Sequence, residues 1–280
     1  MLSYRHAFHA GNHADVLKHL ILVQVMCYLG QKDKPFWYVD THAGAGTYAL
    51  DSPQALKLGE FGDGIGRLWS LKAIPPAVAD YLAVVRAANT DGRLKNYPGS
   101  PCIAQAILRA DDRLRLFERH GRDVLHLRQA MAGDKRTTVE ESDGFAALKA
   151  LLPPPTRRAL ILIDPAYEEK TDYDRVLKAL KDGVRRFPTG VFMLWYPQLT
   201  RLEAQELATR LSRLSAGNWL QAGLRVRTPS ADGFGMHGSN VLVINPPWTL
   251  AATLRECLPF LVRTLAVDAG AGFTLSGESN

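Results

Sequence analysis

Cysteine is scarce in this chain, and the three cysteines, Cys27, Cys102 and Cys257, lie far apart. Their odd number and wide spacing exclude a disulfide scaffold, and no CxxC pair is present for a zinc site of that kind. No run of about 18 apolar residues occurs, so no transmembrane helix is expected. The first residues lack a basic stretch followed by an apolar one, so no secretory signal is expected. These absences predict a protein of the reducing cytoplasm with no membrane partner.

The overall composition is that of a folded protein. Apolar residues make up 46% and charged residues 22% of the 280 positions, which argues against disorder. This length suits one large domain or two small ones. Lys and Arg exceed Asp and Glu by 34 − 28 = 6. The basic balance is compatible with RNA or DNA as a partner, although alone it is weak support.

Short apolar segments alternate with helical patterns along most of the chain. This alternation predicts an α/β fold with a mostly parallel sheet. Asn12 is suited to cap a first helix that ends at Gly30. No helical pattern separates the last two strands, so we expect them to form an antiparallel pair at one edge of the sheet. The seven predicted strands are 36–39, 114–117, 137–139, 159–163, 191–195, 220–226 and 241–244.

The alternation stops between residues 53 and 99, where prolines and glycines separate short helical patterns. We interpret 53–99 as a small inserted helical subdomain. Residues 1–52 and 100–280 then form one main domain. Ser100 and Pro101, a helix cap followed by proline, mark the return of the regular pattern.

A glycine turn, Asp40-x-x-x-Gly44-x-Gly46, follows the first predicted strand. In parallel sheets, ligands bind at the carboxyl ends of the strands, where glycine lets the backbone approach closely. Glu118 ends the next good strand, 74 residues after Gly44. Removing the 47 residues of 53–99 leaves 27, near the roughly 20 of dinucleotide-binding folds. Glu118 is therefore a predicted ligand of a cofactor ribose, and the alternative is an ordinary surface acid.

Asp143 and Gly144 follow the third predicted strand. An acid at this place could accept a hydrogen bond from an adenine amine, while neighbouring backbone N–H groups meet the ring nitrogens. The alternative is that Asp143 caps the next helix and has no other role.

The most informative motif is Asp164-Pro165-Ala166-Tyr167, which follows the fourth predicted strand. The Asp164 carboxylate and the Pro165 carbonyl can hold a target amine with its lone pair facing an electrophile, and Tyr167 can stack on a flat base. The sequence NPPW at 245–248 is an alternative. It follows the seventh strand, which we expect at the sheet edge, away from the cofactor. We therefore favour Asp164.

Aromatic, basic and histidine residues crowd the first 19 positions. Tyr4, Arg5 and His6 are expected to contact RNA, by stacking on a base and by meeting the backbone. The histidine spacings do not complete a ligand set, so no metal is predicted. The alternative is a basic tail without contacts.

Together these motifs resemble those of the bacterial 23S ribosomal RNA adenine-N6 methyltransferase J family. They follow the family's order over nearly the whole chain, and Ala166 departs from it where the family has a second proline. The matching segments are MLSYRHAFHAGNHADVLKH (1–19), DTHAGAG (40–46), YPGSP (97–101), FERH (117–120), DPAYE (164–168), KTDY (170–173) and NPPW (245–248).

The resemblance implies a Rossmann-like seven-stranded methyltransferase sheet. It also implies S-adenosylmethionine as methyl donor and N6-methylation of adenine 2030 in protein-free or early-assembly 23S ribosomal RNA. No metal, membrane or obligate protein partner is implied. Asp164 would be the catalytic carboxylate, with Tyr4 near the adenine. The implied cofactor pocket, with the glycine turn included, contains Lys18, His19, His42, Gly44, Ser100, Glu118, Asp143, Gly144 and Asp164.

Two other classes of function stay open at this point. One is an N6 methyltransferase that acts on DNA adenine or on protein glutamine, since such enzymes use similar tetrads. The other is an RNA-binding protein with a vestigial cofactor cleft.

Overall fold

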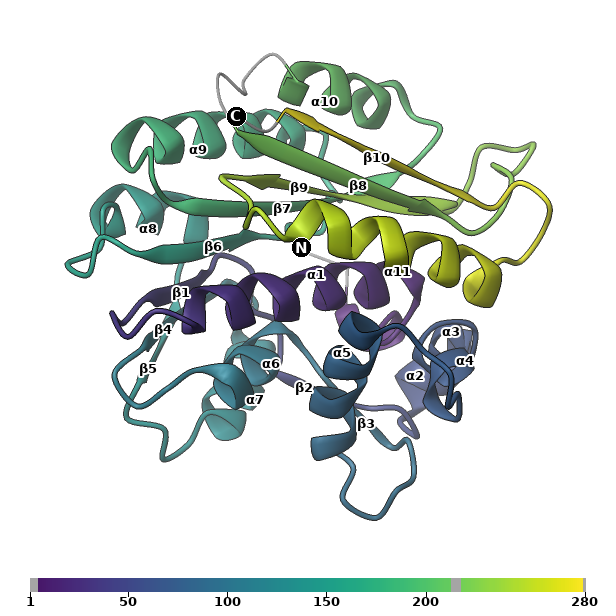
Figure 1. Cartoon of the computed structure of the whole chain (residues 1–280), viewed down its shortest axis with the longest axis horizontal. Coiled ribbons are helices and arrows are strands. Elements are labelled where there is room, and N and C mark those ends of the chain that lie inside the picture. The colour runs from purple at the N-terminus through teal and green to yellow at the C-terminus, as the bar shows by residue number, and fades with distance from the viewer. Residues whose placement is uncertain (1–4, 213–217, 279–280) are drawn as a thin grey trace.

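A mixed β-sheet forms the centre of the computed structural model, which describes residues 5–212 and 218–278 (Figure 1). In these residues the sheet has eight strands in the order β10-β8-β9-β7-β6-β1-β4-β5. The five strands from β7 to β5 run parallel, and β9 is antiparallel to both β7 and β8. The strands are β1 (Trp37–Asp40), β4 (Arg113–Glu118), β5 (Thr137–Glu141), β6 (Ala159–Ile163), β7 (Val191–Gln198), β8 (Trp219–Arg225), β9 (Gly238–Ile244) and β10 (Gly272–Glu278).

Helices cover both faces of this sheet (Figure 1). Leu160 and Leu162 of β6 pack into one helical layer, whereas Ile161 and Ile163 pack into the other, because successive side chains of a strand point to opposite faces. A strand buried on both faces has a continuous apolar sequence, as β6 does. The first layer includes α1 (His13–Gly30), α5 (Pro76–Ala87), α6 (Ser100–Ile107), α7 (Gly121–Ala130) and α11 (Leu250–Leu265), and the second includes α8 (Gly144–Leu151), α9 (Thr171–Arg186) and α10 (Leu202–Ser212).

The first helix, α1, has the predicted boundaries. Asn12 Oδ1 caps it by accepting hydrogen bonds from the backbone N–H groups of Ala14 and Asp15 at 3.0 and 3.1 Å. The helix lies among α5, α6, α11 and the sheet, so it is buried on most sides and carries Asp15 and Lys18 into the interior. Neither α1 nor any other helix within the described ranges is long and apolar enough to cross a membrane.

The glycine turn after β1 does not lead into a helix, as a dinucleotide-binding turn would. It leads into β2 (Thr47–Ala49), which pairs with β3 (Asn96–Pro98) just before α6. Between β2 and β3 lie α2 (Pro53–Leu58), α3 (Glu60–Asp63), α4 (Ile65–Trp69) and α5. Tyr81 and Leu82 of α5 belong to the same core as α1. The division into a main domain and an inserted subdomain at 53–99 stays a prediction.

Two details of the sheet correct the sequence-based expectation. The first is β10, an eighth strand whose sequence contains two glycines and no apolar run, and which therefore lacks a clear strand signal. The second is the position of β9. It pairs antiparallel with β8 as predicted, but β8 and β10 lie outside it, so β9 is not at the sheet edge.

Candidate functional site

A cavity of about 830 Å³ opens at the carboxyl ends of the parallel strands. Its walls come from the turns after β1, β4 and β6, from the last part of β7 and from α1. This is the edge at which parallel α/β sheets bind ligands. The predicted site residues that line it are His6, Lys18, His19, His42, Gly44, Ser100, Glu118, Asp164, Pro165 and Tyr167.

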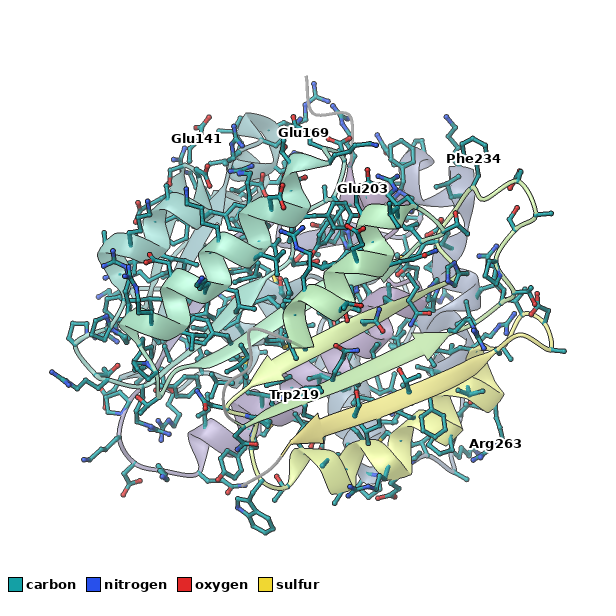
Figure 2. All side chains as sticks on the ribbon, turned by 90° about the horizontal axis from the view of Figure 1, so that it is seen from above. Glu141, Glu169, Glu203, Trp219, Phe234 and Arg263 are labelled. Atoms are coloured by element: carbon teal, nitrogen blue, oxygen red, sulfur yellow. The ribbon has the colours of Figure 1, made fainter. Side chains whose placement is uncertain are left out.

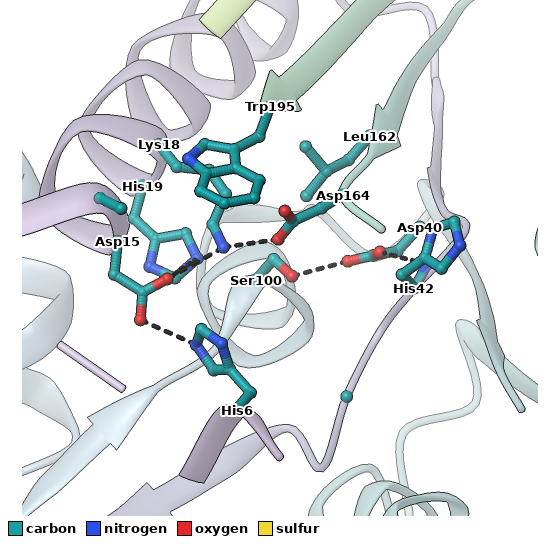
Figure 3. Close-up of polar contacts among 12 residues, drawn as sticks. His6, Asp15, Lys18, His19, Asp40, His42, Ser100, Leu162, Asp164 and Trp195 are labelled. Atoms are coloured by element: carbon teal, nitrogen blue, oxygen red, sulfur yellow. Dashed lines mark hydrogen bonds and ion pairs between the residues drawn. The ribbon is translucent and has the colours of Figure 1, made fainter. Parts of the chain in front are cut away.

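A chain of charged side chains crosses the cavity wall (Figure 3). Lys18 Nζ lies 2.6 Å from Asp164 Oδ2 and 2.9 Å from Asp15 Oδ1. Asp15 Oδ2 lies 2.9 Å from His6 Nε2 and accepts a hydrogen bond from the N–H of Gly11. Burial alone would lower the pKa of Lys18, but the two carboxylates raise it above its ordinary value. Lys18 is therefore a buried cation shared by two acids.

Asp15 completes this chain and was not among the predicted site residues. Burial raises the pKa of its carboxyl, but His6 and Lys18 outweigh that effect and hold the pKa well below its usual value. Only its spacing from Lys18, three positions along one helix, gave a sequence signal.

Asp40, the last residue of β1, is a second buried acid that sequence analysis used only to define the turn. Its Oδ2 accepts hydrogen bonds from the hydroxyls of Tyr38 and Ser100, both at 2.7 Å, and its Oδ1 accepts one from the N–H of His42. Burial raises the pKa of Asp40 to about 6, although these hydrogen bonds act in the opposite direction. Asp40 thus ties the glycine turn to the first turn of α6.

Because burial raises the pKa of Asp40 from 3.8 to about 6, the folded chain binds more protons than the unfolded one between these two pH values. Its contribution to the free energy of unfolding therefore falls as the pH rises from 4 to 6. We expect the free energy of unfolding of wild type to fall by about 1 to 3 kcal/mol over this interval, relative to that of Asp40→Asn. Urea unfolding at several pH values measures the difference, and a difference that does not change with pH would contradict the assignment.

His19 and His42 are neutral at ordinary pH, because burial lowers the pKa of each to about 3. His19 Nδ1 lies 2.7 Å from the hydroxyl of Tyr97, against which its ring stacks. His42 packs edge-on against Phe145. Both side chains thus present uncharged polar groups to the cavity.

Glu118 lies where its predicted role requires, at the end of β4 beside the glycine turn. Its Oε2 accepts a hydrogen bond from the N–H of Gly44, and its Oε1 accepts from the N–H groups of Arg119 and His120, each at 2.8 Å. Two of these donors are the next residues of the chain, and the third belongs to the glycine turn. Glu118 is part of the turn structure and also faces the cavity.

Asp143 and Gly144 lie beside the cavity, not in its lining. Asp143 caps α8 through the N–H of Phe145, and its other oxygen lies 2.6 Å from a guanidinium nitrogen of Arg175. Gly144 packs so closely on the backbone of Thr41 that no side chain fits there. Asp143 therefore caps the helix, as the alternative interpretation expected, and its contact with the cofactor stays a prediction.

The Asp164 turn follows β6, the neighbour of β1 in the sheet. Tyr167 has a left-handed backbone with φ of 52°, and its buried hydroxyl donates to the carbonyl of Trp195 at 2.9 Å. Trp195 itself was predicted only as the end of a strand. Its ring lies 5.8 Å from Lys18 Nζ, so it encloses the same corner of the cavity.

Asn245, the alternative to Asp164, lies at the opposite end of the sheet. Its side-chain amide donates to the carbonyls of Pro188 and Gly190, which precede β7. The predicted separation from the cavity is confirmed, but the predicted reason is wrong. Asn245 is remote because β9 runs antiparallel to β7, not because β9 is an edge strand.

Of the three N-terminal residues predicted to contact RNA, His6 lines the cavity. Tyr4 lies outside the described residues. Arg5 is half-buried and precedes a short 3-10 helix (His6–Phe8), and His6 joins the charged chain through Asp15. Among residues 5–212 and 218–278, no group of three His, Cys, Asp or Glu side chains is placed to hold a metal ion.

The strand order and the cavity together define the class of protein. The chain places β4 and β5 on one side of β1 and then crosses over to place β6 on the other side. The cavity therefore lies at the point where the strand order reverses. Ligand cavities at this point are typical of Rossmann-like α/β proteins.

Comparisons with known proteins narrow this class. The family model described as "Ribosomal RNA large subunit methyltransferase D, RlmJ" matches residues 33–275. Proteins named "Ribosomal RNA large subunit methyltransferase J" are 45% identical in Haemophilus influenzae and 47% identical in Escherichia coli, over 98% and 97% of this chain and 98% and 96% of theirs. A crystal structure of a Legionella pneumophila protein, 33% identical, superposes with a TM-score of 0.89 over 97% of this chain and 99% of that one. The chain belongs to the RlmJ family of ribosomal RNA methyltransferases, as its motifs predict.

Proposed function

We propose that this enzyme transfers a methyl group from S-adenosylmethionine to N6 of adenine 2030 in 23S ribosomal RNA, in the cytoplasm and before the RNA is covered by protein. The observation that carries this proposal is the Asp164-Pro165 turn, which faces the cavity beside the glycine turn of β1. The names of the full-length relatives support an RNA substrate from the large subunit.

The residues of the cavity suit the proposed cofactor. A carboxylate offers about four lone-pair positions, and Glu118 uses three for backbone N–H groups, which leaves room for a ribose hydroxyl. Ser100, His19 and His42 supply neutral polar groups nearby. In this proposal Asp143 and Gly144 are at the adenine end of the pocket.

Glu118→Ala should weaken S-adenosylmethionine binding by about 1 to 3 kcal/mol, the usual loss for hydrogen bonds to a charged group. Glu141→Ala is the matched control, because Glu141 pairs with Glu118 across the neighbouring strand but does not line the cavity. Isothermal titration calorimetry measures both. Unchanged affinity in Glu118→Ala would remove Glu118 from the cofactor site.

Asp164 and Pro165 would orient the amine for reaction. Asp164 Oδ2 accepts a hydrogen bond from Lys18, whereas Asp164 Oδ1 has no hydrogen bond to any described residue. Oδ1 and the Pro165 carbonyl can therefore accept the two hydrogens of N6. The nitrogen lone pair then lies out of the base plane, toward the electrophilic methyl group that S-adenosylmethionine supplies. As the N–C bond forms, the bond from the methyl group to sulfur would break and leave S-adenosylhomocysteine, and N6 would lose one proton to water. Holding the two reactants in this arrangement accounts for much of the expected acceleration.

Lys18 and the N-terminal segment would serve the substrate. Lys18 fixes the carboxylate of Asp164 between α1 and Trp195. We propose that Tyr4, Arg5 and His6 contact the RNA around the target base, with Tyr167 and Tyr4 as the stacking side chains.

A side-by-side transfer assay tests the proposal. Methyl transfer from radiolabelled S-adenosylmethionine is measured into protein-free 23S ribosomal RNA, into DNA and into cell protein. We expect label in the RNA alone, at N6 of a single adenine. Label only in DNA or protein would replace the proposed substrate, and no label in any arm would favour a non-catalytic protein.

A further inference from the structure

The loop between β8 and β9 places an exposed aromatic side chain at the mouth of the cavity. Phe234 is 80% exposed, while the next two residues, Gly235 and Met236, line the cavity. Figure 2 shows Phe234 on the same edge of the molecule as Glu141 and Glu169, which end β5 and follow β6. One side of this loop therefore forms the cavity wall, and the other side carries the phenylalanine.

The loop is held in this conformation by contacts at both of its sides. The hydroxyl of Thr200 donates to the carbonyl of Gly233 at 2.6 Å, which ties the loop to the end of β7. Asp232 Oδ1 accepts a hydrogen bond from the N–H of Phe234 at 3.0 Å. Gly233 and Gly235, on either side of Phe234, have φ values of 75° and 85°, a backbone that glycine adopts without strain. The loop thus holds the backbone of Phe234 in place while its apolar ring stays in solvent, where burial does not stabilise the fold.

Two arginines of the cavity lining belong to the segments that carry and hold the Phe234 loop. Arg227 lies in the same loop and Arg201 follows Thr200, and both are exposed and line the cavity mouth. Acidic residues of the lining come from other elements: Glu168 and Glu169 from the segment between β6 and α9, Asp172 from α9, and Glu60 and Asp63 from α3. Exposed guanidinium groups at the cavity and an exposed aromatic ring on the same loop suit a nucleic acid, with phosphates on the cations and bases on the ring.

The position of Asp164 sets a requirement on the RNA. The Asp164 side chain is 15% exposed and lies inside the cavity, so a base that is stacked in a helix cannot reach it. The target adenine has to leave the stack, which costs a few kcal/mol of lost stacking and pairing. An apolar side chain inserted between base steps offsets part of that cost.

We propose that Phe234 is this wedge: it enters the RNA stack at the place that the target adenine leaves, while Arg201 and Arg227 hold the flanking phosphates. The inference rests on the proposed function, because it needs an RNA adenine as substrate. Phe234 then acts on the conformation of the RNA and not on the methyl transfer itself.

Two synthetic RNAs test the wedge, after wild type has marked its target adenine in protein-free 23S ribosomal RNA. In the first RNA that adenine is paired in a stem. In the second RNA its pairing partner and both of its neighbours are abasic residues, so the adenine is neither paired nor stacked. Single-turnover methylation is measured for Phe234→Ala, for Phe234→Trp and for Trp248→Ala. Trp248 is the matched control, since it is 82% exposed but follows β9 at the opposite end of the sheet from the cavity.

We expect Phe234→Ala to slow methylation of the stem by about tenfold to a hundredfold, the range for one base–aromatic stack. Its rate on the unstacked RNA and its S-adenosylmethionine affinity should match wild type. Phe234→Trp should keep the activity, and Trp248→Ala should behave as wild type. An unchanged stem rate in Phe234→Ala, or an equal loss on both RNAs, would overturn the wedge. Failure of wild type to label any ribosomal RNA would instead overturn the proposed function.

Discussion

Asp164→Ala is expected to lower the rate of methyl transfer by roughly a hundredfold to ten-thousandfold while the chain stays folded. The variant removes the carboxylate that accepts the amine hydrogen, and positioned groups of this kind contribute accelerations of that size. Asp164 is at the cavity surface and not in the apolar core, so its loss leaves the packing of β6 in place. Single-turnover assays on 23S ribosomal RNA measure the rate, and circular dichroism checks the fold.

Asn245→Ala is the control for this experiment, because the segment 245–248 resembles the same tetrad in sequence. Asn245 holds the carbonyls of Pro188 and Gly190 far from the cavity, so its loss should lower the melting temperature and leave the rate per folded molecule unchanged. If Asn245→Ala lost activity and Asp164→Ala kept it, the assignment of the reacting end of the sheet would be wrong.

The second large effect is expected at Lys18. Lys18→Met should lower the free energy of unfolding by about 3 to 5 kcal/mol, because it removes the buried cation that the carboxylates of Asp15 and Asp164 share. Urea unfolding measures the loss. Lys95→Met is the matched surface control, since Lys95 and Asp91 form a similar ion pair that is about half exposed, and its removal should cause no measurable change.

A double variant separates charge from packing at this position. Asp15→Asn combined with Lys18→Met replaces both buried charges by neutral groups, so it should recover a large part of the stability that Lys18→Met alone loses. If the double variant is as unstable as the single one, the aliphatic stem of Lys18 matters more than its charge.

The sequence predicted the elements whose signals are local. The apolar run 159–163 could only be a buried strand, and Asn12 with Gly30 delimited α1 correctly. Glu118 was selected because leaving out 53–99 gives the spacing of dinucleotide-binding folds. The strand before it, β4, pairs with β1, and the cofactor role of Glu118 stays a prediction. The edge strand β10 was not predicted, because an exposed strand that contains glycine does not need the apolar pattern by which strands are recognised.

The residues that sequence reasoning missed act through tertiary contacts. Asp15 becomes significant only when α1 brings it and Lys18 against Asp164, and Asp40 only when α6 brings Ser100 to it. Neither partnership has a sequence signature, because the partners come from segments that the fold brings together. The remoteness of Asn245 likewise depends on strand direction, which residue patterns do not reveal.

The ion pair between Lys18 and Asp164 joins residues 146 positions apart, and this separation bears on when the site forms. A chain that emerges from the ribosome exposes α1 first, with Asp15 and Lys18 already on it. Their partner arrives only after β4, β5 and β6 have been made, and contacts this distant in sequence form slowly. During that interval burial of α1 would take Lys18 out of water without its second carboxylate, which costs free energy. The pocket is thus completed late in synthesis, when β6 inserts beside β1.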